Sequence, residues 1–222
     1  MGVAYNTSII RDGLVLYLDA ANKKSYSGTG TVWNDLSGNG RNSILSNGPT
    51  FNTSFFSFDG TNDVSTLSNN FIPADSSLTV SIWVKARSDG MLVDTLNDSL
   101  SWDGFTIRIQ SSLYRWWLFK QNSGPNIQAA LASTLTYNGN WQNVTGTYDG
   151  TTASLYINGV LDVSVSYSGG YDVGAANIGI GARPSTANPS NCDISNVSIY
   201  NRALSAAEIT QNFNALRGRY NV

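Results

Sequence analysis

Residues 141–165 constrain the fold of this 222-residue chain more than any other stretch. Two turn dipeptides, Asp149-Gly150 and Asn158-Gly159, separate three runs in which apolar and polar residues alternate. Such dipeptides supply the positive φ angles of tight hairpin turns, and a period of two is typical of strands with one buried face. The segment therefore predicts a three-stranded antiparallel meander, whose apolar face a second sheet must cover. The predicted core face comprises Val144, Tyr148, Ala153, Leu155, Ile157, Leu161, Val163 and Val165.

The rest of the chain is also predicted to be mostly β-structure. Strands are expected at residues 13–19, 55–67 (with a turn at Asp59-Gly60), 78–87, 105–110, 114–120, 127–135, 177–182 and 193–200. Residues 20–52 are rich in Gly, Ser, Asn and Asp, and they predict a long irregular loop anchored by Trp33 and Leu36. The fold class is therefore an all-β, two-sheet antiparallel sandwich.

One helix is predicted near the C-terminus. Ser205 and Glu208 form a capping box, and Ile209, Phe213 and Leu216 follow as an apolar stripe. We expect this helix to cover one end of the sandwich and to stop at Gly218. Residues 1–12 are polar and lack periodicity, so we interpret them as an N-terminal arm without a role in the fold, and residues 13–222 as one domain.

Four blocks of the sequence resemble laminin-G-like domains of the concanavalin A-like superfamily. They are FDGTNDV (58–64), LTVSIWVK (78–85), WQNVTGTYDGTTASLYING (141–159) and ISNVSIYNRALS (194–205). The resemblance covers residues 13–216 and implies a jelly roll. It does not select an activity, because this fold hosts lectins, hydrolases and structural modules.

A second resemblance concerns residues 13–20, 27–30, 33–40 and 47–51, which are similar to virion proteins of tailed phages, particularly marine phages and cyanophages. It implies a phage structural or surface protein, either a head decoration or a tail-fibre component. Such a protein would be made in the host cytoplasm, join the virion through other virion proteins or further copies of itself, and adhere to a host surface glycan. The alternative, of another class, is a soluble carbohydrate-binding lectin.

Residue types missing from the chain argue against an enzyme. Histidine is absent, which removes the usual general base and the Ser-His and Cys-His nucleophile systems. The one glutamate, Glu208, belongs to the capping box, so the Glu-x-Asp-x-Glu motif that the resemblance would imply for a glucanase cannot occur. Two aspartates could still support glycoside hydrolysis, but most aspartates lie in turn contexts. We therefore predict a non-enzymatic protein.

Charge and hydropathy exclude further classes. The net charge is −2 with 13% charged residues, so no basic surface for nucleic acid is expected. No apolar run is long enough to span a membrane, and we predict no membrane association. Cys192 is the single cysteine, which excludes an intrachain disulfide, and it is interpreted as a small core residue.

The candidate ligand-binding residues are Tyr114, Arg115, Trp116 and Trp117. In a strand, Tyr114 and Trp116 lie on one face, and Arg115, Trp117 and Phe119 lie on the other. One set belongs to the core. The other is a candidate stacking platform for a sugar or an anchor in a protein interface, where Trp, Tyr and Arg are enriched.

The candidate metal site is an oxygen-rich turn. Asp59, Asn62 and Asp63 offer carboxylate, amide and carbonyl oxygens, which calcium prefers. Asp149 and Asp193 are candidate partners from other segments. Calcium is thus the one cofactor considered, and no other is expected.

Overall fold

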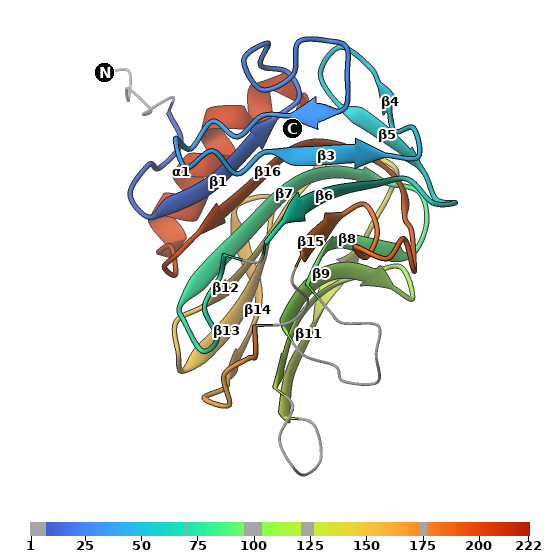
Figure 1. The fold of residues 1–222 in the computed structure, drawn as a ribbon. Helices are drawn as coiled ribbons and strands as arrows, with labels where there is room; N and C mark the ends of the chain where they lie inside the picture. Colours follow the sequence, from blue (N-terminus) through green and yellow to red (C-terminus); the bar gives the residue numbers. More distant parts are fainter. Residues whose placement is uncertain (1–7, 70, 96–103, 121–126, 174–176) are drawn as a thin grey trace.

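The computed structural model describes residues 8–69, 71–95, 104–120, 127–173 and 177–222 (Figure 1). The described residues form two eight-stranded antiparallel sheets that pack face to face, with one α-helix outside them. The predicted all-β, two-sheet sandwich with a short C-terminal helix is therefore confirmed.

Sheet A contains the predicted meander. Its strands, in spatial order, are β14 (Val160–Ser166), β13 (Thr152–Ile157), β12 (Gln142–Tyr148), β7 (Leu78–Ala86), β16 (Asn191–Tyr200), β5 (Phe56–Asp59) and β4 (Thr50–Phe51), and β1 (Leu14–Asp19) also pairs with β16. The turn between β13 and β14 has positive φ at both Asn158 (52°) and Gly159 (77°), as the Asn-Gly dipeptide predicts.

The third strand of the meander differs from the prediction. A register shift between Leu155 and Tyr156 places Leu161 opposite Tyr156, whose ring lies on the helix-covered outer face of sheet A. Leu161 is therefore 51% exposed instead of buried in the core. Val165 is 42% exposed because β14 is the edge strand, and Val163 alone packs partly against the core. The alternating pattern gave no signal of the bulge or of the edge position.

Sheet B is the second layer. Its strands, in spatial order, are β11 (Ile127–Thr136), β10 (Leu113–Lys120), β9 (Gly104–Gln110), β8 (Gly90–Asp94), β15 (Asn177–Ile180), β6 (Val64–Ser68), β3 (Ser43–Ser46) and β2 (Val32–Trp33). The turn at Asp59-Gly60 leads from β5 in sheet A to β6 in sheet B, so it joins the two layers. Residues 20–52 contain strands β2 and β3 of sheet B and strand β4 of sheet A, so this segment is more regular than the predicted loop. Trp33 is fully buried and Leu36 is half-buried, which confirms both anchors.

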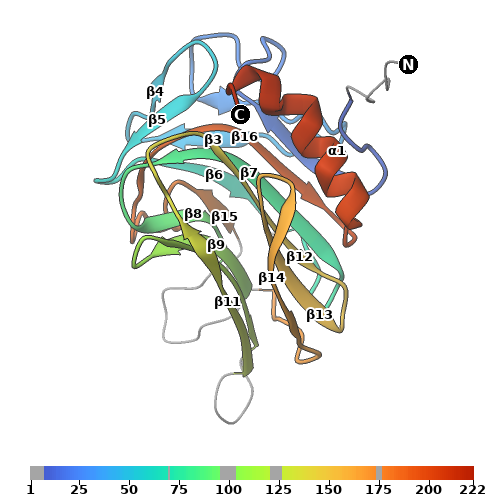
Figure 2. The same ribbon diagram turned by 180° about the vertical axis from the view of Figure 1, so that it is seen from behind.

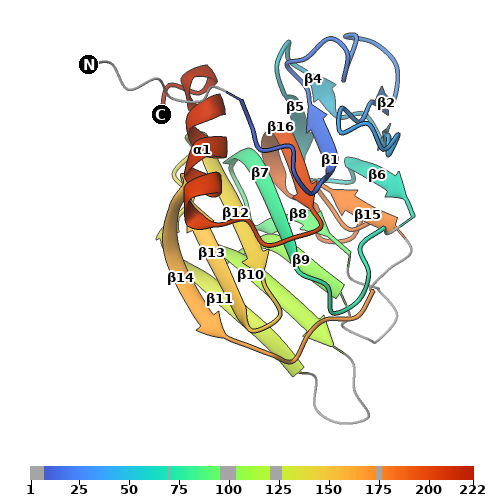
Figure 3. The ribbon, with the colours of Figure 1, turned by 90° about the vertical axis from the view of Figure 1, so that its left-hand side faces the viewer.

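The helix α1 (Ala206–Leu216) lies on the outer face of sheet A, as Figures 2 and 3 show, and not at an end of the sandwich. The capping box is confirmed: the Glu208 N–H donates to Ser205 Oγ at 3.4 Å, and the Ser205 N–H donates to Glu208 Oε2 at 2.9 Å. The helix continues into the 3-10 turn η1 (Arg217–Arg219), so Gly218 does not stop it. Neither of these described helices is long and apolar enough to cross a membrane.

Residues 8–12 belong to the fold, which corrects the prediction of an arm without a structural role. Ile9 is buried against the helix side of sheet A. The Ile10 N–H donates to Asn212 Oδ1 at 2.8 Å, and Asp12 forms an ion pair with Arg202 at 2.9 Å. Residues 1–7 of the predicted arm lie outside the described residues.

Candidate functional site

Two of the four predicted ligand-binding residues are core residues. Tyr114 and Trp116 are fully buried between the sheets. The Tyr114 hydroxyl donates to Gln142 Oε1 at 2.9 Å, and Trp116 Nε1 donates to the Thr147 carbonyl at 3.0 Å. Both polar groups are satisfied inside the protein, so Tyr114 and Trp116 cannot contact a ligand from solvent.

The other two, Arg115 and Trp117, lie on the outer face of sheet B. Both are partly exposed, and Arg115 pairs directly with Arg108 on the neighbouring strand β9. The guanidinium carbon of Arg108 lies 5.0 Å from the centre of the Trp117 ring. The sequence prediction missed Arg108, although the same alternation, continued through the Ser111-Ser112 turn, would have placed it opposite Arg115.

The candidate calcium turn is held by hydrogen bonds of its own. Asp63 is buried and its Oδ2 accepts the Asp59 N–H at 3.0 Å, while Asp59 Oδ1 accepts the Thr61 N–H at 2.7 Å. Burial raises the pKa of the Asp63 carboxyl, and the negative charge of Asp59 raises it further against that hydrogen bond. Asn62 is exposed, and its carbonyl accepts from Asn47 at 2.8 Å. Calcium at these three residues stays a prediction.

The two further partners proposed for calcium are engaged elsewhere. Asp149 accepts the N–H groups of Thr151 and Thr152 in its own turn, at 2.8 and 2.7 Å. Asp193 accepts from Ser57 at 2.7 Å and forms an ion pair with Arg87. In the part of the chain that the structure describes, no three acidic, histidine or cysteine side chains come together. Asp149 and Asp193 therefore do not complete the site.

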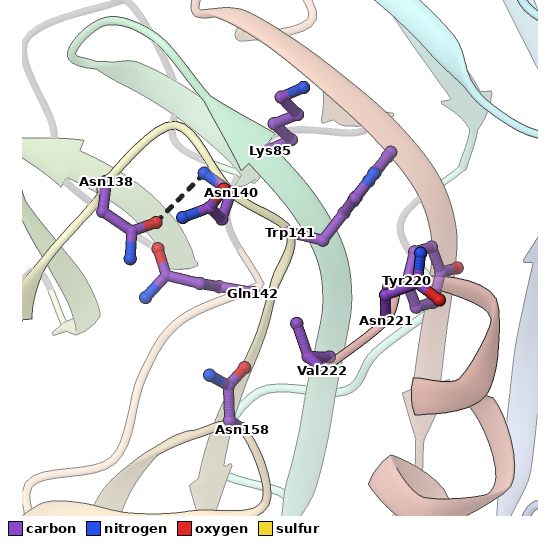
Figure 4. A pocket seen from close by; sticks show the side chains of 9 residues that line it. All are labelled: Lys85, Asn138, Asn140, Trp141, Gln142, Asn158, Tyr220, Asn221 and Val222. Atoms are coloured by element: carbon purple, nitrogen blue, oxygen red, sulfur yellow. Dashed lines mark hydrogen bonds between the residues drawn. The ribbon is translucent and has the colours of Figure 1, made fainter.

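A pocket of about 470 Å³ lies where β12 begins, beside the end of the chain (Figure 4). Its size falls within the usual range for small-ligand sites. No sequence motif marks this pocket, because its walls come from segments far apart in the sequence. The lining residues are Lys85, Asn138, Asn140, Trp141, Gln142, Asn158, Tyr220, Asn221 and Val222.

One wall of this pocket is aromatic. Trp141 is half-buried, and its ring contacts that of Tyr220 at a centroid distance of 4.9 Å and that of Phe55, edge-on, at 5.5 Å. Tyr220 in turn stacks on Trp83 of β7 at 4.0 Å. These contacts fix the orientation of the Trp141 indole before any ligand arrives, which lowers the entropic cost of binding.

The opposite wall is made of amides, as Figure 4 shows for Asn138, Asn140 and Gln142. Gln142 already accepts the Tyr114 hydroxyl, and Asn158 accepts the Asn143 N–H at 2.9 Å. Their NH₂ groups remain as donors, and side-chain amides both donate and accept. No ion pair of the described residues includes Lys85, which borders the same pocket. The pocket thus presents an aromatic face, several amides and one ammonium group.

The core contains no activated nucleophile at Cys192. Burial raises the pKa of its thiol to about 12, so it stays protonated at neutral pH. This agrees with its interpretation as a small core residue.

Comparison with known families identifies the fold. Residues 58–210 match the sequence profile of the concanavalin A-like lectin/glucanases superfamily. The chain belongs to this superfamily. The match spans most of the chain and confirms the laminin-G-like resemblance. A search among proteins with curated descriptions finds no match.

Solved structures of similar fold come from toxin binding domains. The binding domain of Paraclostridial Mosquitocidal Protein 1 aligns with a TM-score of 0.74 and 22% identity, over 92% of this chain and 52% of that one. The botulinum neurotoxin serotype D ligand-binding domain, solved with N-acetylneuraminic acid, aligns with 0.71 and 19%, over 93% and 52%. The botulinum neurotoxin type G receptor-binding domain aligns with 0.66 and 17%, over 91% and 51%. The chain spans about half the length of each, and this likeness establishes the fold alone.

Proposed function

We propose that the protein is a non-catalytic carbohydrate-binding module and that the pocket beside Trp141 holds the saccharide. One observation carries the proposal: a pre-oriented aromatic ring faces a row of side-chain amides across a pocket of about 470 Å³. The apolar face of a sugar ring stacks on an aromatic side chain, and its hydroxyl groups pair with groups that both donate and accept.

The relatives support this class of function. The superfamily includes lectins, and one solved structure of similar fold holds N-acetylneuraminic acid. The lectin alternative weighed from the sequence therefore becomes the first candidate.

The test has two stages. A glycan array with the purified protein identifies a ligand, and calorimetry then measures its Kd for the wild type, Trp141→Ala and Asn140→Ala. We expect Trp141→Ala to weaken binding by about 1–3 kcal/mol, taking the loss of a nucleobase–aromatic stacking contact as the scale. Asn140→Ala should weaken binding by about 1 kcal/mol, the net value of a hydrogen bond. Phe71→Ala is the matched control, since it removes a partly exposed aromatic ring that does not line this pocket. Equal affinity in the Trp141→Ala variant would place the ligand elsewhere.

The non-enzymatic part of the proposal rests on the missing histidine and on Glu208, whose carboxylate is bound by Ser205 and Arg202. We expect no release of reducing ends from β-glucans, pectin or alginate. Hydrolysis that an Asp→Asn variant abolishes would contradict it.

A virion role remains the second candidate. The observation that favours assembly is the edge strand β14, which exposes Val160 (68%), Leu161 (51%) and Val165 (42%). An exposed apolar edge strand pairs readily with another chain. Light scattering should detect a multimer that Leu161→Lys dissociates. Native mass spectrometry should detect the protein in purified phage particles. A monomer at high concentration that is absent from particles would remove this candidate.

A further inference from the structure

The outer face of sheet B carries two arginines on neighbouring strands, Arg108 and Arg115. Strand alternation turns Ile107, Ile109 and Trp116 into the core and leaves Arg108 and Arg115 on the outer face. The two arginines are directly opposite each other on neighbouring antiparallel strands. Like charges in that position destabilise a sheet. The pair therefore carries an electrostatic cost that a bound anion would relieve.

No ion pair among the described residues includes Arg108 or Arg115, although the charges of Asp94 and Asp89 act on Arg108 without direct contact. Asp94 of β8 is fully buried, and its Oδ2 lies 3.5 Å from Nε of Arg183, itself only 9% exposed. Asp89 accepts the Ser111 and Ser112 N–H groups at 2.7 and 3.0 Å, where it holds the β9–β10 turn. Each carboxylate already has a partner other than Arg108 or Arg115.

The electrostatic surroundings of Arg108 agree with this picture. Burial is the main cause that lowers the pKa of its guanidinium. The charges of Asp94 and Asp89 oppose that shift, whereas those of Arg183 and Arg115 add to it. The group remains protonated at neutral pH, so a positive charge persists in a partly desolvated place.

Three buried donors on this face have no hydrogen-bond acceptor. They are Nε of Arg108, Nε of Arg115 and Nε1 of Trp117. An unpaired buried donor costs about 1–3 kcal/mol, and native proteins rarely leave several together. Donors of this kind at one place, next to opposed cations, are typical of a site that an anion completes.

We propose that this face is a second binding site, in which Arg108 and Arg115 hold the carboxylate or sulfate of an acidic saccharide and Trp117 packs against its ring. Guanidinium groups bind planar carboxylates and tetrahedral oxyanions through two parallel N–H bonds. The saccharide part of the proposal rests on the proposed function, but the site is separate from the pocket at Trp141.

The experiment compares four probes on the intact protein by calorimetry: 3′-sialyllactose for a carboxylate, galactose 6-sulfate for a sulfate, lactose as the neutral sugar and inorganic sulfate as the bare ion. We expect one acidic sugar to bind about tenfold or more tightly than lactose, and more weakly as salt increases. If inorganic sulfate bound as tightly as the acidic sugars, the saccharide part of the proposal would be overturned. Binding of lactose as tight as that of both acidic sugars, or no binding of either acidic sugar, would overturn the whole proposal.

Variants locate the interaction. Arg115→Met keeps the aliphatic stem and removes the donors, and Arg108→Gln removes the other guanidinium. Each should weaken acidic-sugar binding about tenfold. Arg115→Lys keeps the positive charge but lacks the planar guanidinium that forms two parallel hydrogen bonds. Its affinity for the acidic sugar should lie between those of Arg115→Met and the wild type. Arg217→Gln removes an exposed charge on η1 and is the matched control. Trp141→Ala should leave acidic-sugar binding at this face unchanged, so failure of the two proposals can be told apart.

Thermal melting separates a binding role from a structural one. Because Arg108 and Arg115 repel each other in the unliganded protein, Arg115→Met should melt at the wild-type temperature or above it. A large fall in the melting temperature of both arginine variants, with acidic-sugar binding unchanged, would mean that the arginines serve the fold and would overturn the proposal.

Discussion

The indole of Trp116 occupies the space that a side chain at Gly146 would need. A β-carbon added to Gly146 would lie 2.4 Å from Cδ2 of Trp116. Gly146 belongs to β12 of sheet A and Trp116 to β10 of sheet B, so the missing side chain sets how closely the two layers approach here. From this position Trp116 Nε1 reaches the Thr147 carbonyl at 3.0 Å.

Gly146→Ala should therefore destabilise the protein, although alanine usually suits a strand better than glycine. Inserting a methyl group into a packed core costs about 1–3 kcal/mol. Urea unfolding would measure the change. Gly218→Ala is the control, because an added β-carbon there meets nothing within 4 Å. If Gly146→Ala were as stable as the wild type, the indole would not lie against this backbone.

The adjacent pair Trp116 and Trp117 shows what could and could not be predicted from the sequence alone. Alternation separated the two indoles onto opposite faces of one strand, which is correct. It could not say which face is the core, because both faces of 114–119 carry large aromatic side chains. Burial was decided by the partner sheet, where Gly146 leaves room for Trp116. Long-range packing of this kind leaves no local signal.

Gly159→Val should destabilise the protein by more than the backbone strain at its turn position alone would cause. The positive φ of 77° resists a β-branched residue, at a cost of about 1–3 kcal/mol. In addition, a β-carbon at Gly159 would lie 2.9 Å from Cβ of Phe213 on α1. Gly150→Val shares the positive φ, at 99°, but has open space around it. Calorimetric melting should therefore rank Gly159→Val below Gly150→Val, and equal melting temperatures would refute the helix contact.

The ion pair of Arg202 and Glu208 gives stability a defined pH dependence. Hydrogen bonds from Arg202, at 2.6 and 3.0 Å, are the main cause that lowers the pKa of Glu208 to about 2. Because the folded-state pKa lies below the ordinary value of 4.5, the stabilisation is fully present above pH 4.5 and is lost as the pH falls through about 2.

Glu208→Gln tests this, since glutamine keeps the capping-box acceptor and removes the charge. Both side chains are partly exposed, so solvent screens the pair and the difference from the wild type should be about 0.5 kcal/mol at neutral pH. Urea midpoints measured from neutral to strongly acidic pH should converge at the acidic end. A difference that does not depend on pH would contradict the assignment.

The calcium prediction is tested by chelation. An ion bound at Asp59, Asn62 and Asp63 would stabilise the native state by mass action, so EDTA should lower the melting temperature of the wild type. Asp63→Ala also loses the hydrogen bond from the Asp59 N–H, so its own melting temperature is uninformative. The informative quantity is the change on adding EDTA, which should vanish in Asp63→Ala. No change in the wild type would remove the site.

The pocket at Trp141 illustrates a second limit of sequence reading. Lys85, Asn158 and Tyr220 belong to a strand, a hairpin turn and the segment after η1. Pairing of β7, β12 and β13 places Lys85 and Asn158 near each other, and docking of the C-terminal helix adds Tyr220. The capping box and apolar stripe predicted the helix itself. Its place on the outer face of sheet A depends on Trp83 and Tyr156, which read as ordinary alternating strand residues.

Residues 8–12 provide the last prediction, because the polar sequence of this segment suggested that its loss would be harmless. Ile9 is buried beside α1, and the Ile10 N–H donates to Asn212 Oδ1, whose amide nitrogen donates to the Tyr200 hydroxyl at 3.0 Å. Ile9→Ala should cost about 2 kcal/mol, at the low end for a buried isoleucine. A chain lacking residues 1–12 should lose at least as much, and one lacking only residues 1–7 is the comparison. Urea unfolding would measure all three. Equal stability of the two truncated chains would mean that the segment does not hold the helix against sheet A.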